Sequence, residues 1–390
     1  MDAQPFAYPD SPRSRPEIPR GACPVISRLA TTGDPPLSTD HSAPTPPIVI
    51  PAAQVEPSNA VGFPARLAAI DVGSNAIRML AAEFRDAASY SVLRRDRGAV
   101  RLGHGSFAAG VLAPEAMDAA VATLTGFRRR MEELGVERYR AVATSAVRES
   151  ANSADFAERV RREAGLELEV IGGDEEAALV RRAVGSRIEL AGRTWVLVDV
   201  GGGSTELVVM DGAGVVRSGS YPLGAVRLLE EFPPAEESLF RFRIMLAERA
   251  AAHLLGTLPG GPEMIGSIAR RLEPAGMIAV GGNIEALARL AGHSAKQGVA
   301  SLPLAELHRL IERIAGLSYR QRIEELGLRE DRADVILPAS VLYEYLAMVI
   351  GADTLLVPWI GVREGVLLAL AEVITTETDT PRAPSSGPPR

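Results

Sequence analysis

Two short segments of this chain place a carboxylate directly before a glycine-rich turn. Residues 71–75 read Asp-Val-Gly-Ser-Asn, and residues 199–205 read Asp-Val-Gly-Gly-Gly-Ser-Thr. Glycine lets the backbone approach a ligand closely, and successive backbone N–H groups in such a turn bind an anion. Hydroxyl and amide side chains add further donors. The segments therefore predict phosphate-binding turns, whose candidate ligands are Gly73, Ser74, Asn75, Gly202, Gly203, Ser204 and Thr205.

The aspartates beside these turns would repel a phosphate. The repulsion is removed if a hard cation such as Mg²⁺ lies between carboxylate and phosphate. Glu206 follows Asp199 by seven residues across the second turn, so the candidate metal ligands are Asp71, Asp199 and Glu206. Taken alone, one such segment is more readily a plain hairpin or an exposed turn. The occurrence of two in duplicated positions favours a phosphate cleft between two domains.

The duplication extends beyond the turns. The pentapeptide Gly-Ala-Val-Arg-Leu occurs at residues 98–102 and again at 224–228. Arg101 follows the first aspartate by 30 residues, and Arg227 follows the second by 28. We interpret the chain as two related domains that each begin with a strand, a Gly/Ser turn and a second strand.

Strand-like and helix-like segments alternate between the motifs, which predicts an α/β fold. The expected strands are residues 67–71, 76–84, 90–94, 140–144, 168–171, 195–200, 206–210, 215–221, 277–280 and 355–357. The expected helices are residues 114–134, 153–164, 174–184, 224–232, 237–256, 283–291, 303–315, 317–327, 331–350 and 362–374. The predicted domains are residues 65–192 and 193–377. Residues 1–64, which hold 14 of the 28 prolines, and residues 378–390 are expected to be disordered tails.

Composition excludes several classes of protein. The net charge of −7 argues against a protein that coats nucleic acid, and the single cysteine, Cys23, excludes an intramolecular disulfide and a Cys-rich zinc site. No uncharged apolar run is long enough to cross a membrane. A reducing, cytoplasmic location fits this composition. Only Lys296 among the 42 basic residues is a lysine, so cationic contacts to phosphate would come from arginine.

The ordered motifs resemble the exopolyphosphatase/guanosine pentaphosphate phosphohydrolase (Ppx/GppA) family, which belongs with actin, sugar kinases and heat-shock ATPases. The motifs that carry the resemblance lie at residues 71–78, 143–152, 173–177, 199–206, 279–283 and 361–365. The sequence departs from the family pattern at Ser150, at Asn283 and at Pro358-Trp359-Ile360. The resemblance is to the short form, without a histidine-rich C-terminal domain.

This resemblance implies two duplicated actin-like ATPase (ribonuclease H-like) domains with an interdomain cleft. It places the general base at Glu176, although Glu175 and Glu176 could also serve only to favour a helix N-terminus. Arg148 would offer a bidentate fork to phosphate, with a surface salt bridge as its competing interpretation. Arg78 and Arg363 are weaker candidates for a distal phosphate or a nucleotide.

The implied activity is hydrolysis of the terminal phosphate of inorganic polyphosphate, of guanosine pentaphosphate, or of both, with Mg²⁺. The alternative is a binding protein that senses guanosine tetraphosphate with little turnover; an ATP-dependent sugar kinase has no sequence feature in its favour. Proteins of this family are often dimers, so a homodimer is a candidate, although the sequence does not determine the oligomeric state. No nucleic-acid or membrane partner is expected.

Overall fold

The computed structural model describes residues 62–211, 214–232, 239–256 and 276–379. The two predicted tails lie outside the described residues, apart from residues 62–64 and 378–379. The Pro-Gly-Gly-Pro segment at 259–262 lies outside them as well.

The first sheet has five strands in the order β3-β2-β1-β4-β5. Strands β1 and β2 and strands β2 and β3 pair antiparallel, whereas β4 joins β1, and β5 joins β4, in parallel. The strands are β1 (Ala65–Val72), β2 (Ile77–Phe84), β3 (Tyr90–Gly98), β4 (Arg138–Ala143) and β5 (Leu168–Val170). Helices α3 (Pro114–Glu133) and α5 (Ser153–Ala164) bury their apolar faces against this sheet, and α2 (Ser106–Ala109) and α4 (Ser145–Arg148) are short.

The second sheet repeats this arrangement and adds one strand. Its order, β8-β7-β6-β9-β11-β10, again has an antiparallel three-stranded meander followed by parallel pairing of β9 to β6. The strands are β6 (Trp195–Val200), β7 (Thr205–Asp211), β8 (Gly214–Tyr221), β9 (Gly276–Val280), β10 (Ala300–Pro303) and β11 (Thr354–Val357). Two copies of one strand order confirm the duplication and the predicted fold class. We call the part built on β1–β5 (residues 65–170) the first lobe and the part built on β6–β11 (residues 195–357) the second lobe.

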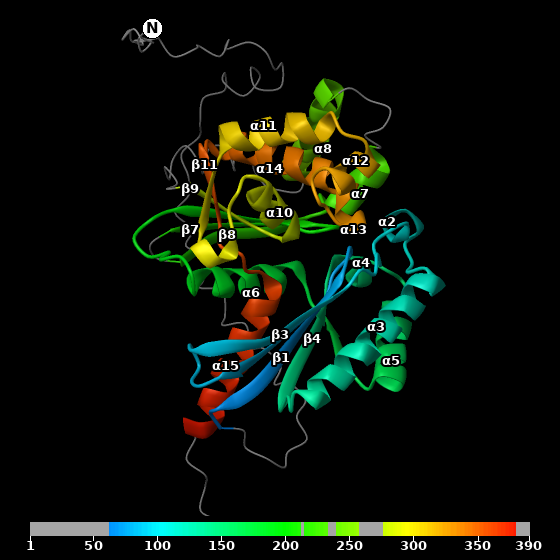
Figure 1. Ribbon diagram of the computed structural model, residues 1–390, viewed down its shortest axis with the longest axis vertical. Helices are drawn as coiled ribbons and strands as arrows, with labels where there is room; N and C mark the ends of the chain where they lie inside the picture. The colour runs from blue at the N-terminus through cyan, green and yellow to red at the C-terminus, as the bar shows by residue number, and fades with distance from the viewer. Residues whose placement is uncertain (1–61, 212–213, 233–238, 257–275, 380–390) are drawn as a thin grey trace, which may run out of the picture. The chain divides into compact units, whose positions relative to one another are not determined.

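Helices α6 (Gly173–Gly185) and α15 (Val362–Asp379) belong to both lobes by their packing. One core cluster joins Leu67 of β1, Val180 of α6, Leu197 of β6 and Leu367 of α15. Trp195 is also buried in this cluster. Each of the two helices follows the last parallel strand of its sheet, β5 or β11, so the duplication includes them (Figure 1).

The remaining helices cover the second sheet. They are α7 (Ala225–Glu231), α8 (Leu239–Gly256), α10 (Gly282–Leu290), the short 3₁₀ helix η1 (Ala295–Gln297), α11 (Leu304–Ala315), α12 (Tyr319–Glu324), α13 (Glu330–Ala333) and α14 (Ile336–Ile350). The helix predicted at 331–350 is divided into α13 and α14. Pro338 has no N–H for the carbonyl of Asp334, so it fits the first turn of a new helix and not the interior of a continuous one. Strand β10 and helices α2 and α4, of four residues each, were not predicted.

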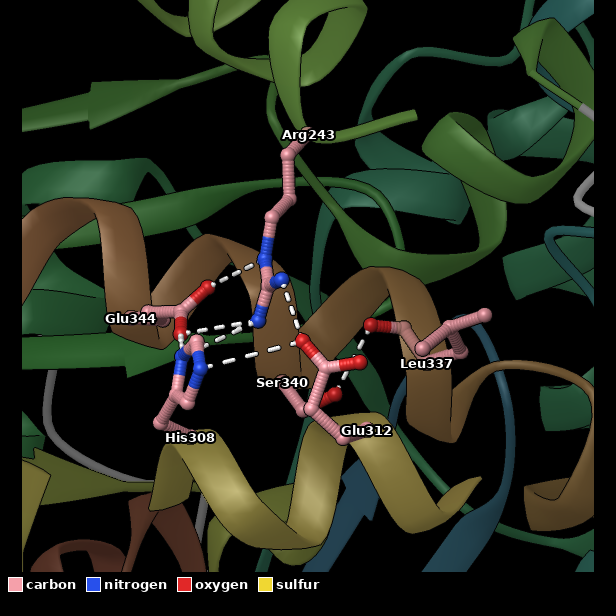
Figure 2. A network of polar contacts seen from close by, with 6 residues as sticks. All are labelled: Arg243, His308, Glu312, Leu337, Ser340 and Glu344. Carbon is pink, nitrogen blue, oxygen red and sulfur yellow. Dashed lines mark hydrogen bonds and ion pairs between the residues drawn. The ribbon is translucent and has the colours of Figure 1, made fainter. Parts of the chain in front are cut away.

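Arg243 of α8 joins two neighbouring helices of the second lobe (Figure 2). Its Nε donates to Glu344 of α14 at 2.9 Å, and its Nη1 donates to Glu312 of α11 at 2.7 Å. His308 of α11 also contacts Glu344, at 2.8 Å. Glu344 is buried, so this network neutralises a charge that would otherwise be costly inside the lobe.

The contact between α6 and α15 depends on Gly365. A Cβ at this position would lie 2.0 Å from the backbone oxygen of Leu179, so the two helices would have to separate. We expect Gly365→Ala to lower the free energy of unfolding by about 1–3 kcal/mol, the usual cost of overpacking a core. The measurement is denaturant unfolding.

Gly126→Ala is the matched control for this prediction. Gly126 lies inside α3 with nothing within 4 Å of its added Cβ, so alanine should stabilise the helix by about 0.5–1 kcal/mol. An unchanged stability in Gly365→Ala would contradict the inference that close packing of α6 on α15 matters.

Candidate active site

A cavity of about 550 Å³ lies where the two glycine turns meet. It is lined by residues of both lobes, of α6 and of the segment before α15. Ten of the predicted site residues line it: Asp71, Gly73, Ser74, Asn75, Arg78, Glu176, Asp199, Gly202, Ser204 and Arg363. The structure thus brings most of the predicted set to one place.

The other four predicted residues lie behind the cavity wall. Gly203, Thr205 and Glu206 are buried, and Arg148 is partly buried. The hydroxyl of Thr205 donates to the carbonyl of Leu223, so this side chain holds the turn in place. Arg148 donates to Glu176 Oε2 at 3.1 Å and to the carbonyl of Ile171 at 2.9 Å. Arg148 is therefore a partner of Glu176, the predicted base. Its ion pair lies at the site, and not on the surface as the competing interpretation had it.

The first turn connects β1 to β2. The N–H of Gly73 donates to the carbonyl of Ala76 at 3.2 Å and closes the turn. Ser74 Oγ lies 3.0 Å from Ser145 Oγ, at the start of α4. Arg78 Nη1 donates to Asp71 Oδ2 at 3.4 Å, so this arginine partly neutralises the carboxylate before the turn.

The second turn connects β6 to β7 and is closed by a hydrogen bond from Gly201 N to the carbonyl of Ser204 at 2.9 Å. The second pentapeptide packs directly against it, and a Cβ at Gly224 would lie 2.2 Å from the carbonyl oxygen of Gly202. Glycine is therefore required at 224 by close approach of two backbones.

Three carboxylates converge behind and beside the second turn. Glu176, Asp199 and Glu206 are only 7%, 7% and 2% exposed. Glu206 accepts from Ser204 Oγ at 2.7 Å and from Ser220 Oγ at 2.8 Å. Burial raises the pKa of all three groups, and their mutual repulsion raises those of Glu176 and Asp199 further. The pKa of Asp199 rises to about 8.

The two neighbouring glutamates of α6 have different surroundings. Glu176 faces the cavity, whereas Glu175 pairs with Arg140, whose Nη2 donates to its Oε1 at 2.6 Å. Arg140 is buried on β4 and also donates to Glu169. Glu176 is therefore accessible to a ligand in the cavity, whereas Glu175 has a structural partner.

Sequence reasoning missed many cavity residues, among them a group of basic side chains. Arginines beyond the predicted two line the cavity: Arg95, Arg97, Arg289, Arg329 and Arg332. Arg332 is buried, its Nε has no hydrogen-bond partner among the described residues, and burial lowers its pKa to about 9. These arginines come from β3, α10 and α13, where no motif marks them. Only the excess of arginine over lysine pointed to them.

The departures from the family pattern lie at the same cavity. Asn283 is buried and lines it, as does Ile360. Trp359 has a left-handed backbone, with φ of 61°, and the Arg289 guanidinium lies 5.0 Å from its ring centroid. Its packing role is thus combined with a cation–π contact at the cavity edge. Ser150 instead donates to the carbonyl of Ala146 inside the first lobe.

Comparison with known proteins places these motifs in a family. The sequence matches the model of the Ppx/GppA phosphatase family over residues 82–373. The chain belongs to the Ppx/GppA phosphatase family. Members of the family similar to it include "Exopolyphosphatase 2" of Mycobacterium tuberculosis, 33% identical over 78% of this chain and 98% of that protein. "Exopolyphosphatase 1" of Mycobacterium leprae is 28% identical over 78% of this chain and 88% of that protein.

Solved structures of Ppx/GppA relatives have the same fold. An exopolyphosphatase from Cytophaga hutchinsonii superposes with a TM-score of 0.71 at 26% identity, over 79% of this chain and 98% of that one. The Aquifex aeolicus family member gives 0.63 at 28% identity, over 80% and 98%. The predicted family and fold class are confirmed. Within the described part of the chain, no helix has the length and apolarity to cross a membrane.

The raised pKa values predict how stability depends on pH. An acid whose pKa is higher in the folded state stabilises that state fully below its unfolded pKa, and the stabilisation is lost as pH rises through the folded pKa. We therefore expect the free energy of unfolding of metal-free protein to fall as pH rises from 3.8 to about 8, owing to Asp199. Asp199→Asn should flatten this fall, as measured by denaturant unfolding in excess chelator.

Asp155→Asn, at an exposed position of α5, should keep the full dependence on pH. A profile of Asp199→Asn that is indistinguishable from this control would show that Asp199 does not titrate as described.

Proposed function

We propose that this chain is an exopolyphosphatase-type phosphohydrolase that releases the terminal phosphate of inorganic polyphosphate. The observation that carries the proposal is the position of Glu176. This carboxylate lies on the first turn of α6 and faces the cavity that both phosphate turns line.

The residues of the site divide into two tasks. The turns at residues 73–75 and 201–204 present backbone N–H groups and hydroxyls, which suit the oxygens of terminal phosphoryl groups. Glu176 would take the proton of a water aligned with the terminal phosphorus. Its raised pKa makes it a stronger proton acceptor once ionised, and the ion pair with Arg148 keeps its side chain in one orientation.

Mg²⁺ is part of the proposal, and the donor set is compatible with it. Among the described residues, no three His, Cys, Asp or Glu side chains form a ready metal site. Magnesium commonly binds through one or two carboxylates together with phosphate oxygens and water. Asp199 and Glu206 would be those carboxylates, with Asp71 as a further candidate, and their mutual repulsion would be relieved by a cation. When bound, the cation would neutralise charge on the phosphoryl oxygens.

Polyphosphate is favoured as substrate because similar proteins are named exopolyphosphatases. Guanosine pentaphosphate, which would lose its 5′-γ-phosphate, is the second candidate, because seven arginines line the cavity: Arg78, Arg95, Arg97, Arg289, Arg329, Arg332 and Arg363. Phosphate release measured side by side from polyphosphate, guanosine pentaphosphate and ATP tests the proposal. Tight binding of guanosine tetraphosphate without release from any of them would favour a sensor and overturn it.

Glu176→Gln tests the general base. Glutamine keeps the size of the side chain but cannot take a proton, so turnover should fall about 10²–10⁴-fold. Affinity for polyphosphate should hold or rise slightly, because one negative charge leaves the cavity. Turnover and a separate binding measurement check both expectations.

Glu175→Gln is the internal control, because Glu175 pairs with Arg140 away from the cavity. It should retain most activity, since Arg140 keeps Glu169 as a partner. A dead Glu175→Gln beside a healthy Glu176→Gln would mean that the wrong carboxylate has been assigned.

Removal of divalent cations tests the metal. We expect excess chelator to abolish turnover and Glu206→Ala to raise the Mg²⁺ concentration needed for half-maximal rate. Glu132→Ala, an exposed acid of α3, should leave that concentration unchanged. Full activity in chelator would remove the metal from the mechanism.

A further inference from the structure

Hydrogen bonds join the glycine turn of each lobe to the second pentapeptide in one lobe and to the residue directly after the first pentapeptide in the other. Just after the first, the N–H of Gly103 donates to the carbonyl of Ser74 at 2.8 Å. In the second, the N–H groups of Ala225 and Val226 donate to Gly201 and Gly202 at 2.9 and 2.8 Å. A shift of either pentapeptide would therefore move the turn that it supports.

The arginine of each pentapeptide contacts the opposite lobe. Arg227, in the second lobe, donates from Nη2 to Glu149 Oε2 of the first lobe at 2.5 Å. Arg101, in the first lobe, has its Nη2 2.7 Å from Asp334 Oδ2 of the second lobe. The duplication has thus produced two reciprocal ion pairs, one from each lobe to the other.

Arg227 also contacts the second turn itself. Its Nε donates to the carbonyl of Gly203 at 3.0 Å, and its guanidinium lies 4.1 Å from the ring centroid of Phe107 in α2. One planar group therefore joins the second phosphate turn to two elements of the first lobe. Only 16% of the Arg227 side chain is exposed, so solvent screens these contacts weakly.

We propose that Arg101 and Arg227 are positioning residues that tie each phosphate turn to the opposite lobe and so hold the two turns at the separation a polyphosphate end requires. The inference rests on the proposed function, because the ligand is taken to touch both turns. Neither arginine lines the cavity, so neither would touch the phosphate directly.

A structural arginine in the same protein provides the contrast. Arg243 has two carboxylate partners but joins only helices of the second lobe, away from the cavity (Figure 2). Its loss should lower the thermal stability without moving one turn relative to the other.

The test uses the full chain with Cys23→Ser and with spin labels on Glu133→Cys and Arg309→Cys, which are exposed positions of α3 and α11. Distances between the labels are measured by pulsed electron resonance, with and without short-chain polyphosphate, and KM and kcat for polyphosphate are measured in unlabelled protein. We expect Arg101→Gln and Arg227→Gln each to broaden the distance distribution and to raise KM about five-fold, an effect typical of a partly buried ion pair. Arg243→Gln should lower the Tm and change neither the distance nor KM.

Two further variants separate the ion pairs from other effects. The exchange Arg101→Asp with Asp334→Arg should restore the narrow distribution and most of the affinity. Arg227→Lys keeps the charge beside Glu149, so the distance between the labels should match that of the wild type. Lysine has no planar fork that could contact Glu149 and Gly203 together, so the second turn loses its contact and KM should stay raised.

An unchanged distance and KM in both arginine-to-glutamine variants would overturn the proposal, as would a loss of Tm alone, the pattern expected of Arg243→Gln. The distance measurement does not depend on turnover. If wild-type protein released no phosphate from polyphosphate, the proposed function would fail while the reciprocal ion pairs were still tested.

Discussion

The site depends on keeping Glu176, Asp199 and Glu206 close together with almost no solvent. Burying like charges is costly, and the cost is reduced by hydrogen bonds, by a cationic partner or by proton uptake. All three routes are present: Ser204 and Ser220 donate to Glu206, Arg148 pairs with Glu176, and burial raises the pKa of each acid. A bound cation would be a fourth, because the mutual repulsion of these carboxylates would favour its binding.

Glu176 is held in this cluster by helix α6. The position of α6 depends in turn on both sheets. The helix shares a core with residues of both sheets and packs on α15 so closely that Gly365 has no room for a Cβ. Glu176, the proposed base, therefore lies on an element that both lobes constrain. Each glycine turn, by contrast, is built by one lobe, and Arg101 and Arg227 make ion pairs that cross between the lobes.

Arginine serves three distinct purposes here, and the environment of each side chain decides which. Arg243 and Arg140 have two carboxylate partners each: Arg243 holds helices of the second lobe together, and Arg140 joins β4 to β5 and α6. Arg332 is buried at the cavity with a lowered pKa and lies near the like charge of Arg78, so it suits an anion that enters from solvent. Arg148 pairs with Glu176, the proposed base. The excess of arginine in the composition could not distinguish these uses, because they differ in neighbours and not in residue type.

The sequence by itself determined the two glycine turns with their aspartates, the alternation of strands and helices, and the duplication. Each of these can be recognised from short runs of neighbouring residues. Those features predicted an α/β fold of two related domains, and the resemblance of the six ordered motifs implied the family and its actin-like fold; the structure and the relatives confirm both. These sequence features could not show that α15 packs with α6 against both sheets, or that Glu175 faces Arg140 while Glu176 faces the cavity. These outcomes follow from contacts between residues far apart in the sequence, such as Arg101 with Asp334 and Arg227 with Glu149, and only the folded chain brings such residues within hydrogen-bonding distance.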